Sequence, residues 1–544
     1  MSDLNGVWDF AQLPLQEDVR AVYILGFKRG TPHPPQAFAL KVFARVATWG
    51  LLIWAALRCV EAFLCRVGPE EPRVVRSKIP ILGQALKLYT QGVTYYENLR
   101  KQTNLPILTT FLGTQKVYVV NSPELITQIN RQGKKIDATL PFLYVVCGKF
   151  FGMHGDDLDG LMRNATAKDS LRHDLKAMEH AALEAGTESA AEIHRNISRE
   201  LADVLSDVAS RGTEEVNLQD WLQKLFTLAT GRGIFGRGNP FDRSDDLIQC
   251  LWTMESGLKQ LTMLPFQSIT ARKAVVARER MIRAFIDEDG PKDSIGLGRG
   301  PIALSQKFSG VSQRHNSSVE FQARYTLGIF TGFVINSVPA VFWIISLLAA
   351  NEGLVSRIRS EVEQVVSVNG PEEMTVEAAA LRTRCQLLVS TCREVLRCIS
   401  SSISTFLVNE DVHLEDGLVL KKGALVQMAA TAIHSNTAVW GPSADELDPE
   451  RFLRRDKVHP SANRVFGGGS SMCPGRHLAL DELLTFTAMF VHTFEVHFSP
   501  DTPTIPQQER NAMLSVKKPS SDLLVQLTRR PGADCRRWKF TTAI

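Results

Sequence analysis

One cysteine in this 544-residue chain follows a run of glycines and precedes a predicted helix. The stretch is Phe466–Gly475, with the cysteine at position 473, and residues 476–484 are predicted to be helical. Glycine lets a backbone bend and approach a flat ligand closely because it has no side chain to collide. Since N–H groups and the dipole at a helix start favour a thiolate, Cys473 is predicted to be ionised. A thiolate beside a flat ligand can serve as the axial ligand of haem iron. The alternative interpretation of Cys473 is a buried structural cysteine.

Two further motifs precede this loop. Glu394 and Arg397 lie three residues apart on a predicted helix, so they share a face and can form a charge-assisted pair. The segment Pro449-Glu450-Arg451-Phe452 follows about fifty residues later. With the spacing Phe-x-x-Gly-x-x-x-Cys-x-Gly, these motifs resemble the Glu-x-x-Arg helix, the Pro-Glu-Arg-Phe segment and the cysteine loop of the cytochrome P450 superfamily.

The resemblance implies a cytochrome P450 fold, mainly α with a minor β domain, preceded by an N-terminal membrane anchor. It implies a thiolate-ligated haem, with Cys473 as the iron ligand and with Phe466, Gly469 and Gly475 as further cofactor-binding residues. It also implies that Arg451 joins the pair of Glu394 and Arg397 in a structural triad behind the haem.

Composition and charge narrow the class of protein. The chain is 44% apolar and 22% charged, with a net charge of +4, so nothing predicts the concentrated basic face that nucleic acid requires. Its nine cysteines lack the paired close spacing of zinc sites or secreted disulfide scaffolds. This usage favours a reducing compartment on the cytosolic side of a membrane.

An apolar segment near the N-terminus predicts contact with membrane lipid. Residues 1–37 form an extension to which we assign no function, and residues 38–67 are the candidate anchor. The charge-free core of that anchor, Val46–Leu57, has 12 residues, whereas a spanning helix needs about 20. Arg45 and Arg58 can reach out from its two ends, and the alternative is an amphipathic helix lying on the membrane surface.

The remaining domain boundaries come from the resemblance. Residues 68–83 resemble a proline-rich hinge, and residues 84–544 then form one haem-thiolate catalytic domain. Basic residues clustered after the anchor favour a cytosolic catalytic domain on a single-pass anchor in the endoplasmic reticulum membrane.

Local patterns predict three further segments. Residues 107–111 and 116–120 alternate apolar and polar side chains around a Gly-Thr turn, which predicts a hairpin. Residues 287–318, rich in Gly, Ser, Asp and Lys, predict a mobile surface connection. The resemblance places pocket-lining segments at 401–406 and 511–516.

The run from Tyr325 to Asn351 carries no charge and predicts either a second membrane span or a buried helix crossing the domain. In the cytochrome P450 family the matching helix passes over the haem and carries an acid beside a threonine, which deliver protons. Here Ile335 and Asn336 replace them, so Asn336 and Ser337 are the predicted catalytic residues that orient water or oxygen. Pro339 is expected to kink the helix.

Two family features are missing. The region matching the Trp-x-x-x-Arg helix of many relatives, Leu171–His180, has no tryptophan, and Ser471 stands where most relatives carry an arginine. Those side chains hold the haem propionates in the relatives. Other groups must therefore neutralise the propionates here, and the sequence does not identify them.

The segment 336–343 resembles the branch with sterol 7α-hydroxylase, sterol 12α-hydroxylase and prostacyclin synthase, and the long extension resembles fungal secondary-metabolism members. The resemblance implies a monooxygenase that oxidises a small but bulky apolar substrate of sterol, terpenoid or polyketide type, using oxygen and an NADPH-dependent reductase. One alternative is an isomerase or dehydratase that rearranges an oxygenated substrate without a reductase. Another is a non-catalytic haem-binding or lipid-binding membrane protein.

Overall fold

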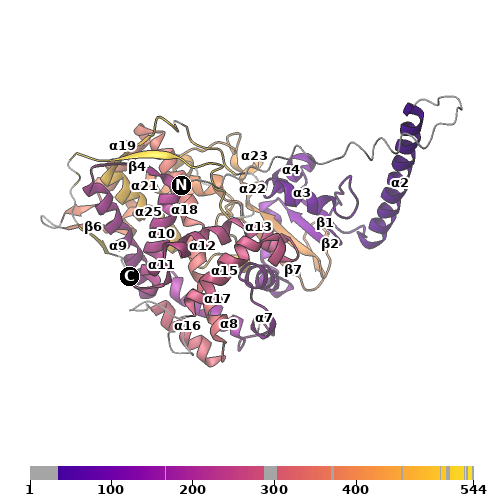
Figure 1. Ribbon diagram of the computed structural model, residues 1–544, viewed down its shortest axis with the longest axis horizontal. Helices are drawn as coiled ribbons and strands as arrows, with labels where there is room; N and C mark the ends of the chain where they lie inside the picture. Colours follow the sequence, from indigo (N-terminus) through magenta and orange to yellow (C-terminus); the bar gives the residue numbers. More distant parts are fainter. Residues whose placement is uncertain are drawn as a thin grey trace, which may run out of the picture. The chain divides into compact units, whose positions relative to one another are not determined.

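A computed structural model describes most of the chain (Figure 1). The described residues are 35–165, 167–286, 303–368, 373–454, 458–502, 504–509, 515–531, 533 and 537–541. They divide into two units, with the boundary between Leu64 and Cys65. Residues 1–34 of the predicted extension and 511–514 of the predicted pocket-lining turn lie outside the described residues.

The first unit contains one long helix, α2 (Pro35–Leu64), whose 30 residues span about 45 Å. The stretch Phe43–Leu64 is long and apolar enough to cross a membrane, and only 6% of its most apolar part is buried. Large apolar side chains such as Trp49 are exposed along it. Arg58 pairs with Glu61 at 2.5 Å, so its charge is balanced within the helix. The apolar part of α2 therefore continues past Arg58 and is longer than the 12-residue charge-free core.

The second unit is mainly helical, and this confirms the predicted fold class. Its longer helices are α4 (Thr94–Thr103), α8 (Leu171–Leu183), α9 (Glu188–Ser210), α10 (Leu218–Phe235), α12 (Asp245–Ser256), α15 (Arg272–Phe285), α16 (Ala303–Arg314), α17 (Val319–Val334), α18 (Ser337–Ala349), α19 (Glu352–Glu363), α21 (Gln386–Ile399) and α25 (Arg476–Thr493).

Four small sheets complete this unit. The largest has the order β1-β2-β10-β7-β3, and the others have the orders β11-β12-β4, β13-β6-β5 and β8-β9. The strands are β1 (Ile107–Leu112), β2 (Gln115–Val120), β3 (Ile136–Asp137), β4 (Thr213–Asn217), β5 (Ser367–Val368), β6 (Glu373–Glu377), β7 (Ile403–Val408), β8 (Val412–His413), β9 (Val419–Leu420), β10 (Leu425–Ala429), β11 (Phe494–Phe498), β12 (Leu524–Arg529) and β13 (Arg537–Thr541).

The predicted hairpin is confirmed. Strands β1 and β2 pair antiparallel from Ile107 opposite Val120 to Leu112 opposite Gln115. The turn between them uses Gly113 at a φ of +68°, a left-handed conformation that glycine adopts without strain.

The apolar run after Tyr325 lies in two helices, α17 and α18. They are core helices and not a membrane span, since 72% of the most apolar part is buried inside the protein. The interruption lies earlier than the kink predicted at Pro339, since α17 ends at Val334 and α18 begins at Ser337. Proline at position 339 cannot donate to the carbonyl of Ile335, and its ring crowds that carbonyl. The helix therefore breaks around Ile335 and Asn336 rather than bending at the proline.

The predicted mobile connection at residues 287–318 is wrong for its second half, which forms α16. Leu304, Phe308 and Val311 are buried at the spacing of one helix face. The end of α16 lies beside α8 (Figure 1). Arg314 and His315 both contact Asp174 there. The polar composition concealed this apolar stripe, and residues 287–302 lie outside the described residues.

Candidate haem site

The glycine-rich loop closes on itself before α25. The backbone N–H of Cys473 donates to the carbonyl of Phe466 at 2.9 Å, which ties the two ends of the loop together. The Ser471 hydroxyl donates to the carbonyl of Gly468 at 2.9 Å. Phe466 packs its partly buried ring against the main hydrophobic core. These contacts hold Cys473 in place, with its side chain only partly covered by protein.

Two glycines of this loop adopt conformations that other residues would adopt only with strain. Gly467 has a φ of +73°, and a Cβ there would lie 2.7 Å from the carbonyl oxygen of Ser471. Gly469 has a φ of +59°, and a Cβ there would collide with Oδ1 of Asn130. Gly475 differs, because its φ is −84° and a Cβ would meet nothing closer than 4.0 Å. Gly469 is therefore required by the loop itself, whereas a Cβ at Gly475 would make ordinary contacts with the Cys473 sulfur and Leu183 at 4.0 Å.

The Cys473 thiol lies just before a helix and not at its first residue. Helix α25 begins three residues later, at Arg476, and burial raises the pKa of the Cys473 thiol. The N–H of Gly475 and the charge of Arg476 lower this pKa, but they do not outweigh burial. The loop therefore holds the sulfur in place, and a metal bound there would favour its thiolate form.

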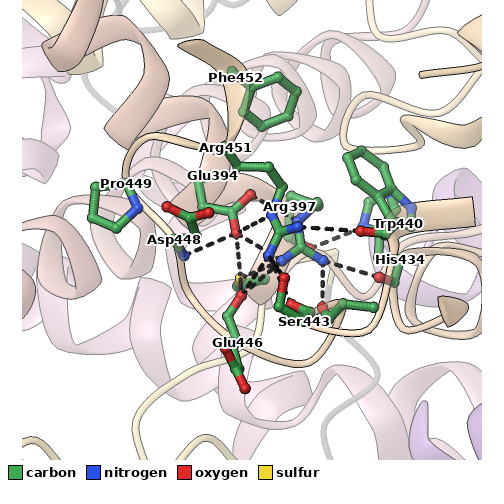
Figure 2. Close-up of polar contacts among 12 residues, drawn as sticks. Glu394, Arg397, His434, Trp440, Ser443, Glu446, Asp448, Pro449, Arg451 and Phe452 are labelled. Carbon is green, nitrogen blue, oxygen red and sulfur yellow. Dashed lines mark hydrogen bonds and ion pairs between the residues drawn. The ribbon is translucent and has the colours of Figure 1, made fainter. Parts of the chain in front are cut away.

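The structure brings Glu394, Arg397 and Arg451 together (Figure 2). Arg397 binds the Glu394 carboxylate with two nitrogens, Nε at 2.8 Å and Nη2 at 2.7 Å. Arg451 reaches the same carboxylate through Nε at 2.8 Å, and the N–H of Asp448 donates to it at 3.1 Å. Glu394 is fully buried, and α21 supplies it together with Arg397.

Backbone carbonyls take up the remaining guanidinium donors of this triad. Arg397 donates to the carbonyls of residues 434, 444 and 446, and Arg451 to those of residues 440, 443 and 446. Burial raises the pKa of Glu394, but hydrogen bonds and charge from Arg397 and Arg451 outweigh it and leave this pKa below its usual value. The triad thus fixes α21 to the segment 434–451 that leads to the ligand loop.

A buried histidine links the triad to the ligand loop, and sequence reasoning missed this role. Nε2 of His434 accepts from the backbone N–H of Arg464 at 2.9 Å, so the ring proton lies on Nδ1. Nδ1 then donates to the carbonyl of Arg397, also at 2.9 Å. Burial lowers the pKa of His434 to about 3, and the ring is neutral at neutral pH.

The two predicted catalytic residues lie where α17 and α18 break, and they differ in their contacts. Oδ1 of Asn336 is buried and has no hydrogen-bond partner among the described residues. Gly332 lies one turn earlier on the same face, and a Cβ there would meet nothing within 4 Å. Oδ1 of Asn336 is therefore an acceptor left without a donor among the described residues. The Ser337 hydroxyl instead donates to the carbonyl of Phe333 at 2.8 Å.

The α8 region that lacks the family tryptophan carries a charge pair. Arg172 lies 3.7 Å from Glu179, and the Tyr325 hydroxyl of α17 donates to Glu179. The charge of Glu179 also contributes to raising the pKa of the Cys473 thiol. Glu179 thus joins α8 to α17, and its negative charge offsets that of Arg172.

A second buried carboxyl lies on α25, and it predicts a dependence of stability on pH. Glu482 is 3% exposed, and burial raises the pKa of its carboxyl group to about 8. Between pH 4.5 and about 8 the unfolded chain releases a proton that the folded chain keeps, so stability falls as pH rises.

Glu482→Gln is expected to remove that dependence. Its advantage in free energy of unfolding over the wild type should grow by about 1.4 kcal/mol for each pH unit toward pH 8. Urea unfolding of both proteins at several pH values between 6 and 8 measures this difference. A constant difference would show that Glu482 is ionised in the folded protein.

The site fits a haem by three observations on its own residues. The loop leaves the Cys473 side chain partly uncovered, and a Cβ at Gly332 would meet nothing within 4 Å. Arg464 is a buried cation without a carboxylate partner within 4.0 Å among the described residues. A flat ligand with a metal centre and acidic side groups requires these three properties. The fold and the site therefore define a haem-thiolate protein.

Comparisons with known proteins give the family. The cytochrome P450 family model matches residues 315–525, which include α17, α21 and the ligand loop. A cytochrome P450 monooxygenase, nodJ, of Hypoxylon pulicicidum is 26% identical over 87% of this chain and 92% of its own. A cytochrome P450 monooxygenase of Gibberella zeae is 28% identical over 89% and 93%. A 7-alpha-hydroxycholest-4-en-3-one 12-alpha-hydroxylase of Oryctolagus cuniculus is 22% identical over 89% and 99%.

The chain belongs to the cytochrome P450 superfamily, and it is an enzyme that binds haem through a cysteine thiolate. This confirms the family and the cofactor that the motifs predict. The relatives also include both kinds that the sequence resembles, fungal monooxygenases and sterol hydroxylases.

Proposed function

We propose that this protein is a membrane-bound monooxygenase that oxidises a bulky apolar substrate with molecular oxygen and electrons from an NADPH-dependent reductase. The observation that carries this proposal is the ligand loop, which fixes Cys473 between its contact with Phe466 and the start of α25. A haem held by this thiolate would activate oxygen, because the sulfur donates electron density that favours cleavage of the O–O bond.

Separate groups of residues are proposed to shape the cofactor loop, to support it and to deliver protons. Phe466, Gly469 and Gly475 shape the loop around the cofactor, and Glu394, Arg397 and Arg451 hold the scaffold behind it. Asn336 is the proposed catalytic residue on the opposite side, because its unpartnered Oδ1 can accept from a water that carries protons toward oxygen. Ser337 is proposed to support that position through its bond to Phe333.

The substrate class is supported by relatives. One of them, the 7-alpha-hydroxycholest-4-en-3-one 12-alpha-hydroxylase, acts by its name on a sterol, and others are fungal monooxygenases. We therefore propose a sterol-like, terpenoid or polyketide substrate from secondary metabolism.

The proposed location is the endoplasmic reticulum membrane, with α2 as a single-pass anchor and the catalytic domain in the cytosol. The length and exposed apolar side chains of α2 support this proposal. Fractionation of cells expressing the full chain, followed by carbonate extraction, tests it. Release of the protein by carbonate would contradict a spanning anchor and favour a helix lying on the membrane surface.

Dependence of turnover on a reductase tests the proposed reaction. The purified full chain is incubated with a candidate sterol or terpenoid, oxygen, NADPH and a microsomal reductase, and each component is left out in turn. A monooxygenase requires all of them and places one oxygen atom of labelled dioxygen in the product. Product formation without reductase and oxygen would instead favour an isomerase or dehydratase, an alternative suggested by Ile335 in place of the family acid.

Asn336→Ala is expected to lower substrate turnover by about 10-fold or more, because the variant loses the acceptor that positions a proton-carrying water. Substrate binding should not change, so the spectral shift that substrate induces keeps its midpoint. The ratio of product formed to NADPH consumed measures the effect. Equal ratios in wild type and variant would contradict the role of Asn336. Ser346→Ala serves as the control, because the Ser346 hydroxyl lies on α18 but donates to the carbonyl of Phe342.

A further inference from the structure

Arg464 is a buried cation that lacks a partner of opposite charge among the described residues. Its side chain is 2% exposed, and Nε has no hydrogen-bond partner among the described residues. Its guanidinium makes one hydrogen bond to a side chain there, from Nη2 to Oγ of Ser404 at 2.9 Å. A serine hydroxyl is neutral, so the charge itself is not compensated within the described part of the chain.

Other buried arginines of the protein show what is missing. Arg397 and Arg451 reach Glu394, and Arg324 reaches Glu279. A guanidinium cannot give up its proton at neutral pH, and an isolated buried charge is costly to the fold. Burial lowers the pKa of Arg464 to about 10, and no carboxylate of the described residues opposes this effect. The site around Arg464 therefore suits an anion that does not belong to the chain.

Arg464 is placed beside the ligand loop by several contacts. Its backbone N–H donates to His434, and its carbonyl accepts from the Ser402 hydroxyl at 3.1 Å and from the Gly467 N–H at 3.1 Å. Nη1 lies so close to Gly468 that a Cβ there would collide with it. The guanidinium thus lies between β7 and the loop that ends in Cys473.

Other cations near the loop are already engaged. Arg172 pairs with Glu179 at 3.7 Å, and Arg476 donates to the carbonyl of Cys473 at 3.3 Å. The position that carries an arginine in most relatives is Ser471, whose hydroxyl donates to Gly468. Among the described residues at this loop, Arg464 is thus the fully buried arginine without a carboxylate within 4.0 Å.

We propose that Arg464 binds a propionate carboxylate of the haem and thereby takes over from the arginine that Ser471 replaces. The planar guanidinium matches a carboxylate in shape and charge, and its Nε and Nη1 have no side-chain partner among the described residues. This inference rests on the proposed haem binding at Cys473, and it does not depend on which reaction the enzyme catalyses.

Haem loss from the loaded full-length protein tests this inference. The rate of haem transfer to excess apomyoglobin is measured for the wild type and for Arg464→Met, which keeps the volume but removes the charge. Each protein is loaded either with haem or with its dimethyl ester, whose propionates carry no charge. We expect the variant to lose haem at least 10-fold faster than the wild type, and both proteins to lose the ester at the same rate.

Two further variants make the result specific. Arg464→Lys keeps the charge without the planar fork and is expected to lose haem at an intermediate rate. Arg359→Met is the matched control, because Arg359 is also largely buried but donates to Val491 and Phe494 at the far end of α25. It should lose haem and ester at wild-type rates.

Three results would overturn the inference. The Arg464→Met variant could lose haem and the ester faster than the wild type by the same factor. That result would show that Arg464 only supports the loop. The variant could also retain haem as the wild type does. If this variant does not fold, a wild type that holds haem and ester equally long would exclude a charged propionate contact. Each result leaves the monooxygenase proposal standing, because that proposal is judged by reductase-dependent turnover.

Discussion

Replacing Cys473 by serine is expected to abolish the absorption band that thiolate-ligated haem shows in its reduced, carbon monoxide-bound form. A serine hydroxyl is a far weaker donor to iron than a thiolate and cannot supply the electron density that favours O–O cleavage. Turnover of any substrate should fall by about 1,000-fold or more, as is usual when a group that works as part of a catalytic unit is removed. The spectrum of the dithionite-reduced protein with carbon monoxide measures the first effect.

Cys250→Ser provides the control for this experiment. Cys250 lies on α12 and is partly buried, like Cys473, but it is outside the ligand loop. This variant should keep both the band and the turnover. A Cys473→Ser protein that still shows the band of thiolate ligation would mean that another cysteine binds the iron, and the site described above would then be wrong.

Glu394→Ala is expected to destabilise the folded protein by about 3–5 kcal/mol, since it leaves Arg397 and Arg451 buried without a counter-charge. Most of the expressed protein should then lack haem, because the triad fixes α21 to the segment that leads to the ligand loop. Urea unfolding and the haem content per chain measure the two effects.

Two control variants show whether the loss of stability is specific to the buried triad. Glu410 lies 3.3 Å from Lys135 on the surface, with 57% of its side chain exposed, so Glu410→Ala should change stability by less than about 1 kcal/mol. Glu394→Gln keeps the shape of the side chain and removes its charge. An unchanged stability of Glu394→Ala would contradict the role of the triad.

The difference between wild type and Glu394→Gln should also depend on pH. Since the folded pKa of Glu394 lies below its unfolded value of 4.5, the stabilisation is present above that pH and is lost as pH falls through the folded pKa. The two unfolding midpoints should therefore converge in acid.

Motifs made of neighbouring residues could be predicted from the sequence. The β1–β2 hairpin follows from alternating side chains around Gly113, and the chain's family follows from the order of its three motifs. The pair of Glu394 and Arg397 follows from helical spacing, because residues three apart always share a face. In each case the geometry is local, so the sequence contains the information.

Only the tertiary structure shows those properties of a residue that depend on its neighbours in the fold. The spacing around Cys473 predicts a ligand loop, but only the folded chain shows that the loop is closed by a hydrogen bond from the Cys473 N–H to the carbonyl of Phe466. Pro339 predicts a kink, but the helix breaks earlier because the crowded carbonyl belongs to Ile335. The effect of a residue is thus set by neighbours that the sequence does not reveal.

Arg464 is the clearest example of this difference. In the sequence, Arg464 is one of many arginines and lies near the glycine run, and no motif spacing marks it as a ligand-binding residue. Folding buries it between β7 and Gly468, bonds it to Ser404 and leaves its charge without a partner among the described residues. The sequence determined the family, the cofactor and the candidate ligand, whereas only the tertiary structure could show which cation is left unpaired, because pairing depends on residues far apart in the chain.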